Sequence, residues 1–305
     1  MKKIYIYAPD FDENSGGAVV LHRLCHLINQ TDTHQAFLTP RKFERFEFYS
    51  LKAFMVSCKS LLSNMVKRRL VKLKCNSGWD TPVDYRSSID DDSIVVYSEM
   101  AFGNPLRAKN VVRWFLHQPG HILNAFHFGR GELYFRYASN IKPFEYCYST
   151  MSKHELRIVY YPLDKYNDEN LPKKRGTCHL IRKGGFKKKI HPADSIQVDG
   201  LSHDEISKIF RRSERFISYD DYTAYSTFAA LCGCESIVVP AESVSKLAWY
   251  PREEQHYGIA FGFNEEELAW AKRTVSNLKE KLRQEDQQSF NNTRMFLDEM
   301  EIFFK

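Results

Sequence analysis

The chain has 305 residues and a formal net charge of +6, with 43% hydrophobic and 14% aromatic residues. This composition is typical of a folded protein rather than a disordered one, and no apolar run reaches the roughly 18 to 20 residues that span a bilayer. The lack of such a run predicts a protein that is soluble or at most peripheral to a membrane. Because single cores stop growing at about 250 to 300 residues, the length predicts two domains.

The N-terminus and the cysteines predict a cytoplasmic protein. Met1 to Asp10 places two lysines before a short apolar stretch that ends at Pro9, which is not the pattern of an export signal. The seven cysteines form no Cys-x-x-Cys pair, and their number is odd. We therefore expect reduced thiols, no disulfide and no structural zinc.

The first lobe begins with a strand, a glycine turn and a helix. Ile4 to Ala8 is an apolar run rich in β-formers, and Gly16-Gly17 opens a segment with apolar residues at helical spacing. A glycine pair at this place lets the backbone approach a phosphate and presents free N–H groups at the positive end of the helix dipole. Gly16 and Gly17 are candidate donor-binding residues, with a simple ligand-free turn as the alternative.

One segment, Lys59–Lys74, accounts for the whole excess of positive charge. It has six basic and no acidic residues, interleaved with apolar residues that fall mostly on one face of a helix. An ordinary surface helix is the favoured interpretation. Contact with an anionic membrane surface is the second, and nucleic acid or another partner is the third. The rest of the chain has no net charge and no nucleic-acid motif, so we expect no nucleic-acid role.

Further strands of the first lobe are predicted at Gln35 to Thr39, Ile94 to Tyr97 and Val111 to Leu116, while Phe126 to Tyr148 gives no secure prediction. His117 follows the last of these strands. A neutral imidazole at a strand end can hydrogen-bond a sugar or an acceptor hydroxyl and act as a base, so His117 is a candidate catalytic residue. A purely structural histidine is the alternative.

A polar segment, Tyr161 to Lys174, is predicted to link the lobes. We expect a first domain over residues 1–165, a second over 166–285, and a terminal helix over 286–305 that crosses back to the first domain. The second lobe contains a Ser-x-x-Glu capping box at Ser202 to Glu205. Two terminal helices are predicted, from about Glu265 to Arg283 and from Ser289 to the end.

Cations gather where the first strand of the second lobe ends. The short apolar run from Thr177 to Ile181 is followed by a basic, glycine-containing turn. Its cations can neutralise a departing diphosphate, and no Asp-x-Asp metal clamp accompanies them, so we expect charge stabilisation without a metal. A solvated basic loop is the alternative. The candidates are Arg182 and Lys187 as catalytic residues, and Lys183 and Gly184 as nucleotide-binding residues.

Acids gather at a neighbouring strand end, where Arg215 to Tyr219 runs into Asp220-Asp221 ahead of a helix that opens near Ser226. Carboxylates there repel phosphate but accept hydrogen bonds from sugar or ribose hydroxyls. Helix capping explains part of this pattern without any ligand. Asp220 is a candidate catalytic residue, and the donor-binding candidates are Asp221, Tyr222, Thr223, Ser226 and Thr227.

Together these residues resemble a known family. The glycine pair, the basic turn, and Phe216 to Pro240 resemble retaining glycosyltransferases of the GT-B fold, family four. Three segments look like small bacterial transferases of surface-polysaccharide clusters, namely Val111–Gly120, Arg175–Gly184 and Tyr222–Cys234. The resemblance implies an α/β protein of the GT-B type, with two Rossmann-like domains facing a central cleft.

The resemblance also implies a function. We expect transfer of a sugar from a nucleotide-sugar donor to a lipid-linked or polysaccharide acceptor in bacterial surface glycan synthesis (lipopolysaccharide O-antigen or capsule), with retention and without cofactor or metal. The location would be cytoplasmic, peripheral on the inner face of the plasma membrane. The family carries two glutamates, whereas this sequence has Asp220 and Phe228 at those places. The alternatives are a noncatalytic sugar- or nucleotide-binding partner in an assembly complex and a GT-B-fold sugar-nucleotide epimerase.

Overall fold

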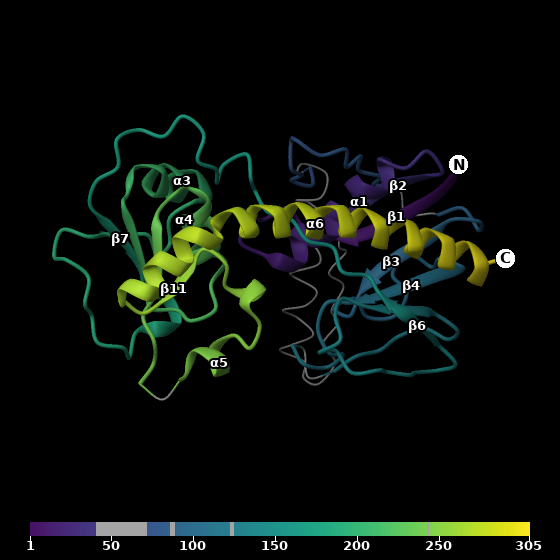
Figure 1. The fold of residues 1–305 in the computed structure, drawn as a ribbon. Coiled ribbons are helices and arrows are strands. Elements are labelled where there is room, and N and C mark those ends of the chain that lie inside the picture. Colours follow the sequence, from purple (N-terminus) through teal and green to yellow (C-terminus); the bar gives the residue numbers. More distant parts are fainter. Residues whose placement is uncertain (41–71, 86–88, 123–124, 243) are drawn as a thin grey trace, which may run out of the picture. The chain divides into compact units, whose positions relative to one another are not determined.

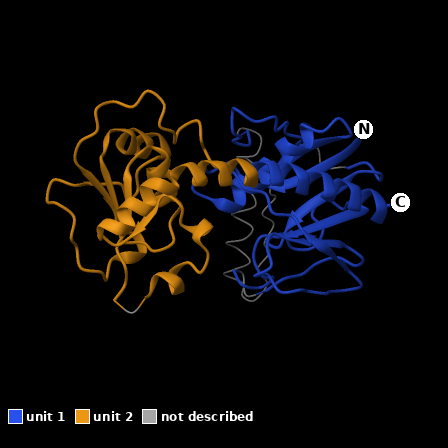
Figure 2. Ribbon diagram, in the orientation of Figure 1, with its two compact units in different colours: residues 1–160, 286–305 blue, residues 161–285 orange. Residues whose placement is uncertain are grey.

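The structure is a computed structural model that describes residues 1–40, 72–85, 89–122, 125–242 and 244–305. The predicted basic helix over Lys59–Lys74 therefore lies almost wholly outside the described residues. The chain forms two compact units, shown in Figure 2. Unit 1 comprises Met1–Tyr160 and Asp286–Lys305, and unit 2 comprises Tyr161–Glu285. The polar segment from Tyr161 to Lys174 contains neither helix nor strand.

Unit 1 is built on a six-stranded sheet with the order β2-β1-β3-β4-β5-β6, in which every neighbouring pair is parallel (Figure 1). Parallel sheets of this kind bury both faces, and the central strands are accordingly apolar. The core combines the sheet with α1 and the end of α6 (Glu265–Phe303). The strands are β1 (Lys2–Ala8), β2 (His34–Pro40), β3 (Ile94–Ser98), β4 (Asn110–Phe115), β5 (Leu133–Arg136) and β6 (Thr150–Glu155), and α1 spans Gly16–Asn29.

The sequence predicts β1 to β4 and α1 correctly, but it gives no prediction for β5 and β6. Strand β6 is polar and partly exposed, because it lies at the edge of the sheet and needs no apolar run. Strand β5 lies inside the aromatic-rich segment, where Phe128, Tyr134 and Phe144 pack against one another and against Phe115 of β4. Aromatic residues dispersed through loops conceal the alternation that marks a strand.

Unit 2 is built on a five-stranded parallel sheet with the order β11-β10-β9-β7-β8. Its α3 begins at the predicted capping box, in which the Ser202 side chain accepts from the Glu205 backbone and Glu205 accepts from the Ser202 backbone. The elements are β7 (Thr177–Leu180), η1 (Arg182–Gly184), β8 (Ile196–Gln197), α3 (His203–Arg212), β9 (Arg215–Ser218), α4 (Ala224–Leu231), β10 (Glu235–Val238), α5 (Lys246–Trp249), η2 (Glu253–Gln255) and β11 (Ile259–Phe261).

The C-terminal segment is one helix, α6, from Glu265 to Phe303, and the prediction of two helices is wrong. No glycine or proline interrupts its 39 residues, and residues 284–288 are mostly good helix formers. Its apolar positions contribute to both cores, with Leu278 and Leu282 in unit 2 and Phe296 and Met300 in unit 1. The helix is therefore held along its length by packing rather than by propensity alone.

Both units are thus α/β units with parallel sheets, which is compatible with two Rossmann-like domains. None of the helices in the described part of the chain is long and apolar enough to cross a membrane.

Candidate functional site

In unit 2, the basic turn and the acidic loop lie side by side at the carboxyl ends of β7 and β9. These strands are parallel neighbours with Leu180 opposite Ser218, so the residues that follow each strand leave the sheet at the same edge. Arg182 Nε lies 3.9 Å from Asp220 Oδ2. The Arg182 side chain is 51% exposed, whereas that of Asp220 is 8% exposed. A ligand at this edge therefore meets a solvent-facing cation beside a largely buried carboxylate.

The backbone of the basic turn already holds an anion from within the protein. The N–H groups of Ile181 and Arg182 donate to the two carboxylate oxygens of Asp199, at 2.9 and 2.7 Å. Burial acts to raise the pKa of Asp199, but these backbone hydrogen bonds outweigh it and lower the pKa below its ordinary value. Arg182 has a left-handed backbone, with φ of 36°. The N–H groups of Ile181 and Arg182 are therefore already occupied by a carboxylate of the protein.

Gly184 has a packing role in the turn. A Cβ atom at this position would lie 2.0 Å from the carbonyl oxygen of Tyr219, a distance that no real contact allows. Gly185, the next residue, has open space where its Cβ would be. Only glycine at position 184 lets the turn lie directly on the end of β9, and this close approach brings Arg182 next to Asp220.

The cations of the turn divide into two sets. Lys187 is buried, and its amine donates to Asp221 Oδ1 at 2.6 Å and to the carbonyl oxygen of Val239 at 2.7 Å. Lys189 donates to three carbonyl oxygens of the turn itself. Arg182, Lys183 and Lys188 are exposed. The exposed cations are therefore Arg182, Lys183, Lys188 and Lys189, of which Lys189 bonds to the turn itself. Lys187 ties the basic turn to the ends of β9 and β10.

On the acidic side, the helix starts earlier than predicted. Thr223, rather than Ser226, is the N-cap of α4, and its hydroxyl accepts from the backbone of Tyr225 at 3.3 Å. Asp220 Oδ1 accepts from the backbone of Tyr222, also at 3.3 Å. Tyr222 is 62% exposed, and the guanidinium of Arg182 lies 5.9 Å from the ring centre of Tyr225. The start of α4 thus places the Tyr225 ring beside the Arg182 cation.

The remaining residues predicted on α4 lie further inside. Ser226 is 2% exposed, and Thr227 is partly buried. Phe228 is 6% exposed and stacks on Tyr166, with ring centres 4.4 Å apart and planes 9° apart. Position 228, where the sequence resemblance would place a second carboxylate, is thus a core position in this protein.

In unit 1, His117 lies beside a carboxylate, Glu99, that was not predicted from the sequence. His117 Nδ1 is 3.4 Å from Glu99 Oε1, and the side chains are 52% and 4% exposed. The other oxygen, Oε2, accepts from the backbone N–H of Leu116 at 2.8 Å. Glu99 directly follows β3, and β3 pairs with β4, so both residues leave the sheet at one edge. The signal in the sequence was an acidic residue immediately after an apolar run.

The glycine pair begins α1 at this same edge. Gly16 is the first residue of the helix, and the hydroxyl of Ser15 accepts from the backbone of Ala18 at 3.5 Å. A Cβ on Gly17 would lie 3.6 Å from Leu116 Cδ1, which is ordinary van der Waals contact. The N-terminus of α1 therefore lies close to the strand end that carries His117.

Within the described ranges, no group of three or more histidine, cysteine, aspartate or glutamate side chains could hold a metal ion. The sequence matches no known protein-family model, and it matches no curated protein.

Proposed function

We propose that this protein is a glycosyltransferase of the GT-B type that moves a sugar from a nucleotide-sugar donor to a lipid-linked or polysaccharide acceptor in bacterial surface glycan synthesis. The observation that supports the proposal is the juxtaposition of Arg182 and Asp220 at the carboxyl edge of a parallel sheet. This edge is where open α/β sheets bind their ligands.

Arg182 and Asp220 have complementary roles in the proposal. When the bond between the anomeric carbon and the phosphate oxygen breaks, the electron pair leaves with the nucleoside diphosphate. A guanidinium binds phosphate oxygens with paired hydrogen bonds and offsets this charge, and Lys183 is the second exposed cation nearby. The carboxylate of Asp220 accepts hydrogen bonds from hydroxyls of the donor. In unit 1, His117 hydrogen-bonds a sugar or acceptor hydroxyl.

Binding and turnover test the proposal separately. Nucleoside diphosphate binding is measured by calorimetry, and hydrolysis or transfer is measured over a panel of nucleotide sugars. Since a hydrogen bond to a charged group contributes about 1.5 to 3 kcal/mol, Arg182→Ala should weaken diphosphate binding roughly 10- to 100-fold. Lys188→Ala, an exposed cation of the same segment, should have little effect. Equal affinity in wild type and Arg182→Ala would rule out the assigned role.

A noncatalytic sugar- or nucleotide-binding partner is the second candidate, and one observation favours it. The ring of Phe228 fills the place of a family carboxylate, packed on Tyr166. Diphosphate binding that depends on Arg182, together with no turnover of any donor, would select this candidate. Conversion of a donor with no acceptor present would indicate an epimerase instead.

A further inference from the structure

Glu99 of unit 1 has a buried carboxylate beside His117 and was not among the residues predicted from the sequence. We propose that Glu99 is a positioning residue that accepts a hydrogen bond from the Nδ1–H of His117. This hydrogen bond keeps the proton on Nδ1, so that Nε2 is the ring nitrogen that accepts a hydrogen bond from a substrate hydroxyl. The binding of a substrate hydroxyl to Nε2 rests on the proposed function. The position of the proton on Nδ1 rests only on the geometry of Glu99 and His117.

The surroundings of Glu99 support this role. Its side chain is 4% exposed, and one of its oxygens is held by the Leu116 N–H. A desolvated carboxylate needs a donor on its other oxygen as well, and His117 Nδ1 is the group beside Oε1. A neutral imidazole carries one proton, and a carboxylate partner fixes that proton on the nitrogen facing it. At 3.4 Å the two atoms are in contact, although farther apart than in a tight hydrogen bond.

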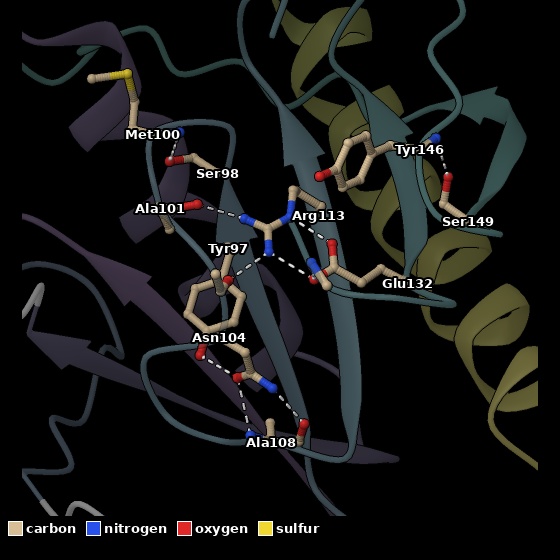
Figure 3. Close-up of polar contacts among 12 residues, drawn as sticks. Tyr97, Ser98, Met100, Ala101, Asn104, Ala108, Arg113, Glu132, Tyr146 and Ser149 are labelled. Atoms are coloured by element: carbon tan, nitrogen blue, oxygen red, sulfur yellow. Dashed lines mark hydrogen bonds and ion pairs between the residues drawn. The ribbon is translucent and has the colours of Figure 1, made fainter. Parts of the chain in front are cut away.

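A buried arginine, Arg113, holds the loop that follows Glu99 (Figure 3). The guanidinium of Arg113 donates to the carbonyl oxygens of Ala101 and Gly103, at 2.7 and 2.8 Å. It also pairs with both oxygens of Glu132, and Arg113 and Glu132 are 0% and 2% exposed. Figure 3 shows the guanidinium reaching the loop on one side and Glu132 on the other. Glu99 is thus attached to a rigid segment, as a positioning residue requires.

A purely structural role for Glu99 makes a different prediction. In that role the carboxylate would only accept the hydrogen bond of the Leu116 N–H through Oε2. Which ring nitrogen of His117 carries the proton would then not depend on Glu99. The His117 ring is 52% exposed, and its nearest histidine, His121, lies with its ring centre 6.5 Å away. An imidazole without a carboxylate partner favours the form with its proton on Nε2 in water.

The test is the imidazole nitrogen spectrum of protein labelled with ¹⁵N-histidine, recorded at a pH where His117 is neutral. The signals of His117 are those missing from His117→Gln. We expect a protonated Nδ1 and an unprotonated Nε2 in the wild type, and a shift toward protonated Nε2 in Glu99→Gln. The control is Glu155→Gln, which removes a carboxylate from another ion pair of unit 1, that with Arg136. A wild-type ring protonated mainly on Nε2, or a spectrum unchanged by Glu99→Gln, would overturn the inference.

This measurement uses no substrate, so its failure is distinct from failure of the proposed function. If Glu99→Gln does not fold, as judged by its thermal transition, the wild-type tautomer still decides. Where transfer is detected, Glu99→Gln should lower kcat by roughly 10- to 100-fold and leave the KM for the donor nearly unchanged, because the ring loses its orientation rather than its contact. An unchanged kcat would contradict the positioning role.

Discussion

The amine of Lys187 lies 2.6 Å from Oδ1 of Asp221, so these two predicted ligand-binding residues bind each other. The lysine side chain is 4% exposed, and its amine also donates to the carbonyl oxygen of Val239. The pair joins the basic turn after β7 to the loops after β9 and β10. The positive charge of Lys187 is therefore already balanced by Asp221, and the proposed contacts with an anionic ligand fall on the exposed Arg182 and Lys183.

Removing the Lys187 amine should destabilise unit 2. Lys187→Met leaves Asp221 without its buried partner, and breaking such a pair typically costs about 3 kcal/mol or more. We expect a loss of this size in the free energy of unfolding, measured by urea denaturation. The control Lys188→Met alters an exposed neighbour and should change it by less than about 0.5 kcal/mol. Equal effects of the two substitutions would contradict the role of Lys187 in joining the basic turn to the loops after β9 and β10.

Gly184→Ala should be far more damaging than Gly185→Ala. The added methyl group at position 184 would meet the Tyr219 carbonyl at 2.0 Å, so the backbone must move, at a cost of about 1 to 3 kcal/mol. At position 185 the methyl group meets nothing, and the backbone φ of −57° suits alanine. Thermal unfolding of both variants checks this. A stable Gly184→Ala protein would show that the turn does not need its close contact with β9.

Placing a carboxylate at position 228 should harm this protein. Phe228→Glu places a charge at a 6% exposed position against the ring of Tyr166, and it also leaves a void where the phenyl ring packs. Loss of a buried phenyl ring alone typically costs about 3 to 5 kcal/mol. Thr227→Glu is the matched control on the same helix, because Thr227 is partly exposed. Improved turnover in Phe228→Glu, without loss of stability, would contradict the core role of Phe228.

Stability should fall as the pH is lowered below about 6.5, in part through His256. Burial, followed by the charge of Lys246, lowers the pKa of His256 below its ordinary value of 6.5. The unfolded state then takes up a proton more readily than the folded state in this range, so acid favours unfolding, with a slope of at most about 1.4 kcal/mol per pH unit for one group. His256→Phe should reduce this slope between pH 6.5 and 5, as measured by urea unfolding.

The matched control for the pH dependence is the exposed His154. His154→Phe should leave the slope of stability against pH as it is in the wild type. A slope that is the same in all three proteins would show that His256 is not linked to folding.

Much of the fold was predictable because it depends on local patterns. Apolar runs predict the central strands β1, β3 and β4, since strands buried on both faces of a parallel sheet need continuous apolar residues. The capping box predicts the start of α3, because it satisfies the first N–H groups of that helix within four residues. Edge strand β6 and the continuity of α6 depend on neighbours that a short stretch of sequence does not contain.

The sequence by itself determined that cations and carboxylates follow the ends of short apolar runs, because a charge inside a buried strand is costly unless a partner balances it, as Glu132 balances Arg113. Only the tertiary structure decided which of those charges face solvent. Lys187 and Arg182 are both cations of one short segment, yet one is enclosed by Asp221 and Val239 and the other is half exposed. Glu99 likewise gained its partner only when β3 paired with β4, because register across a sheet, rather than distance along the chain, brings such side chains together.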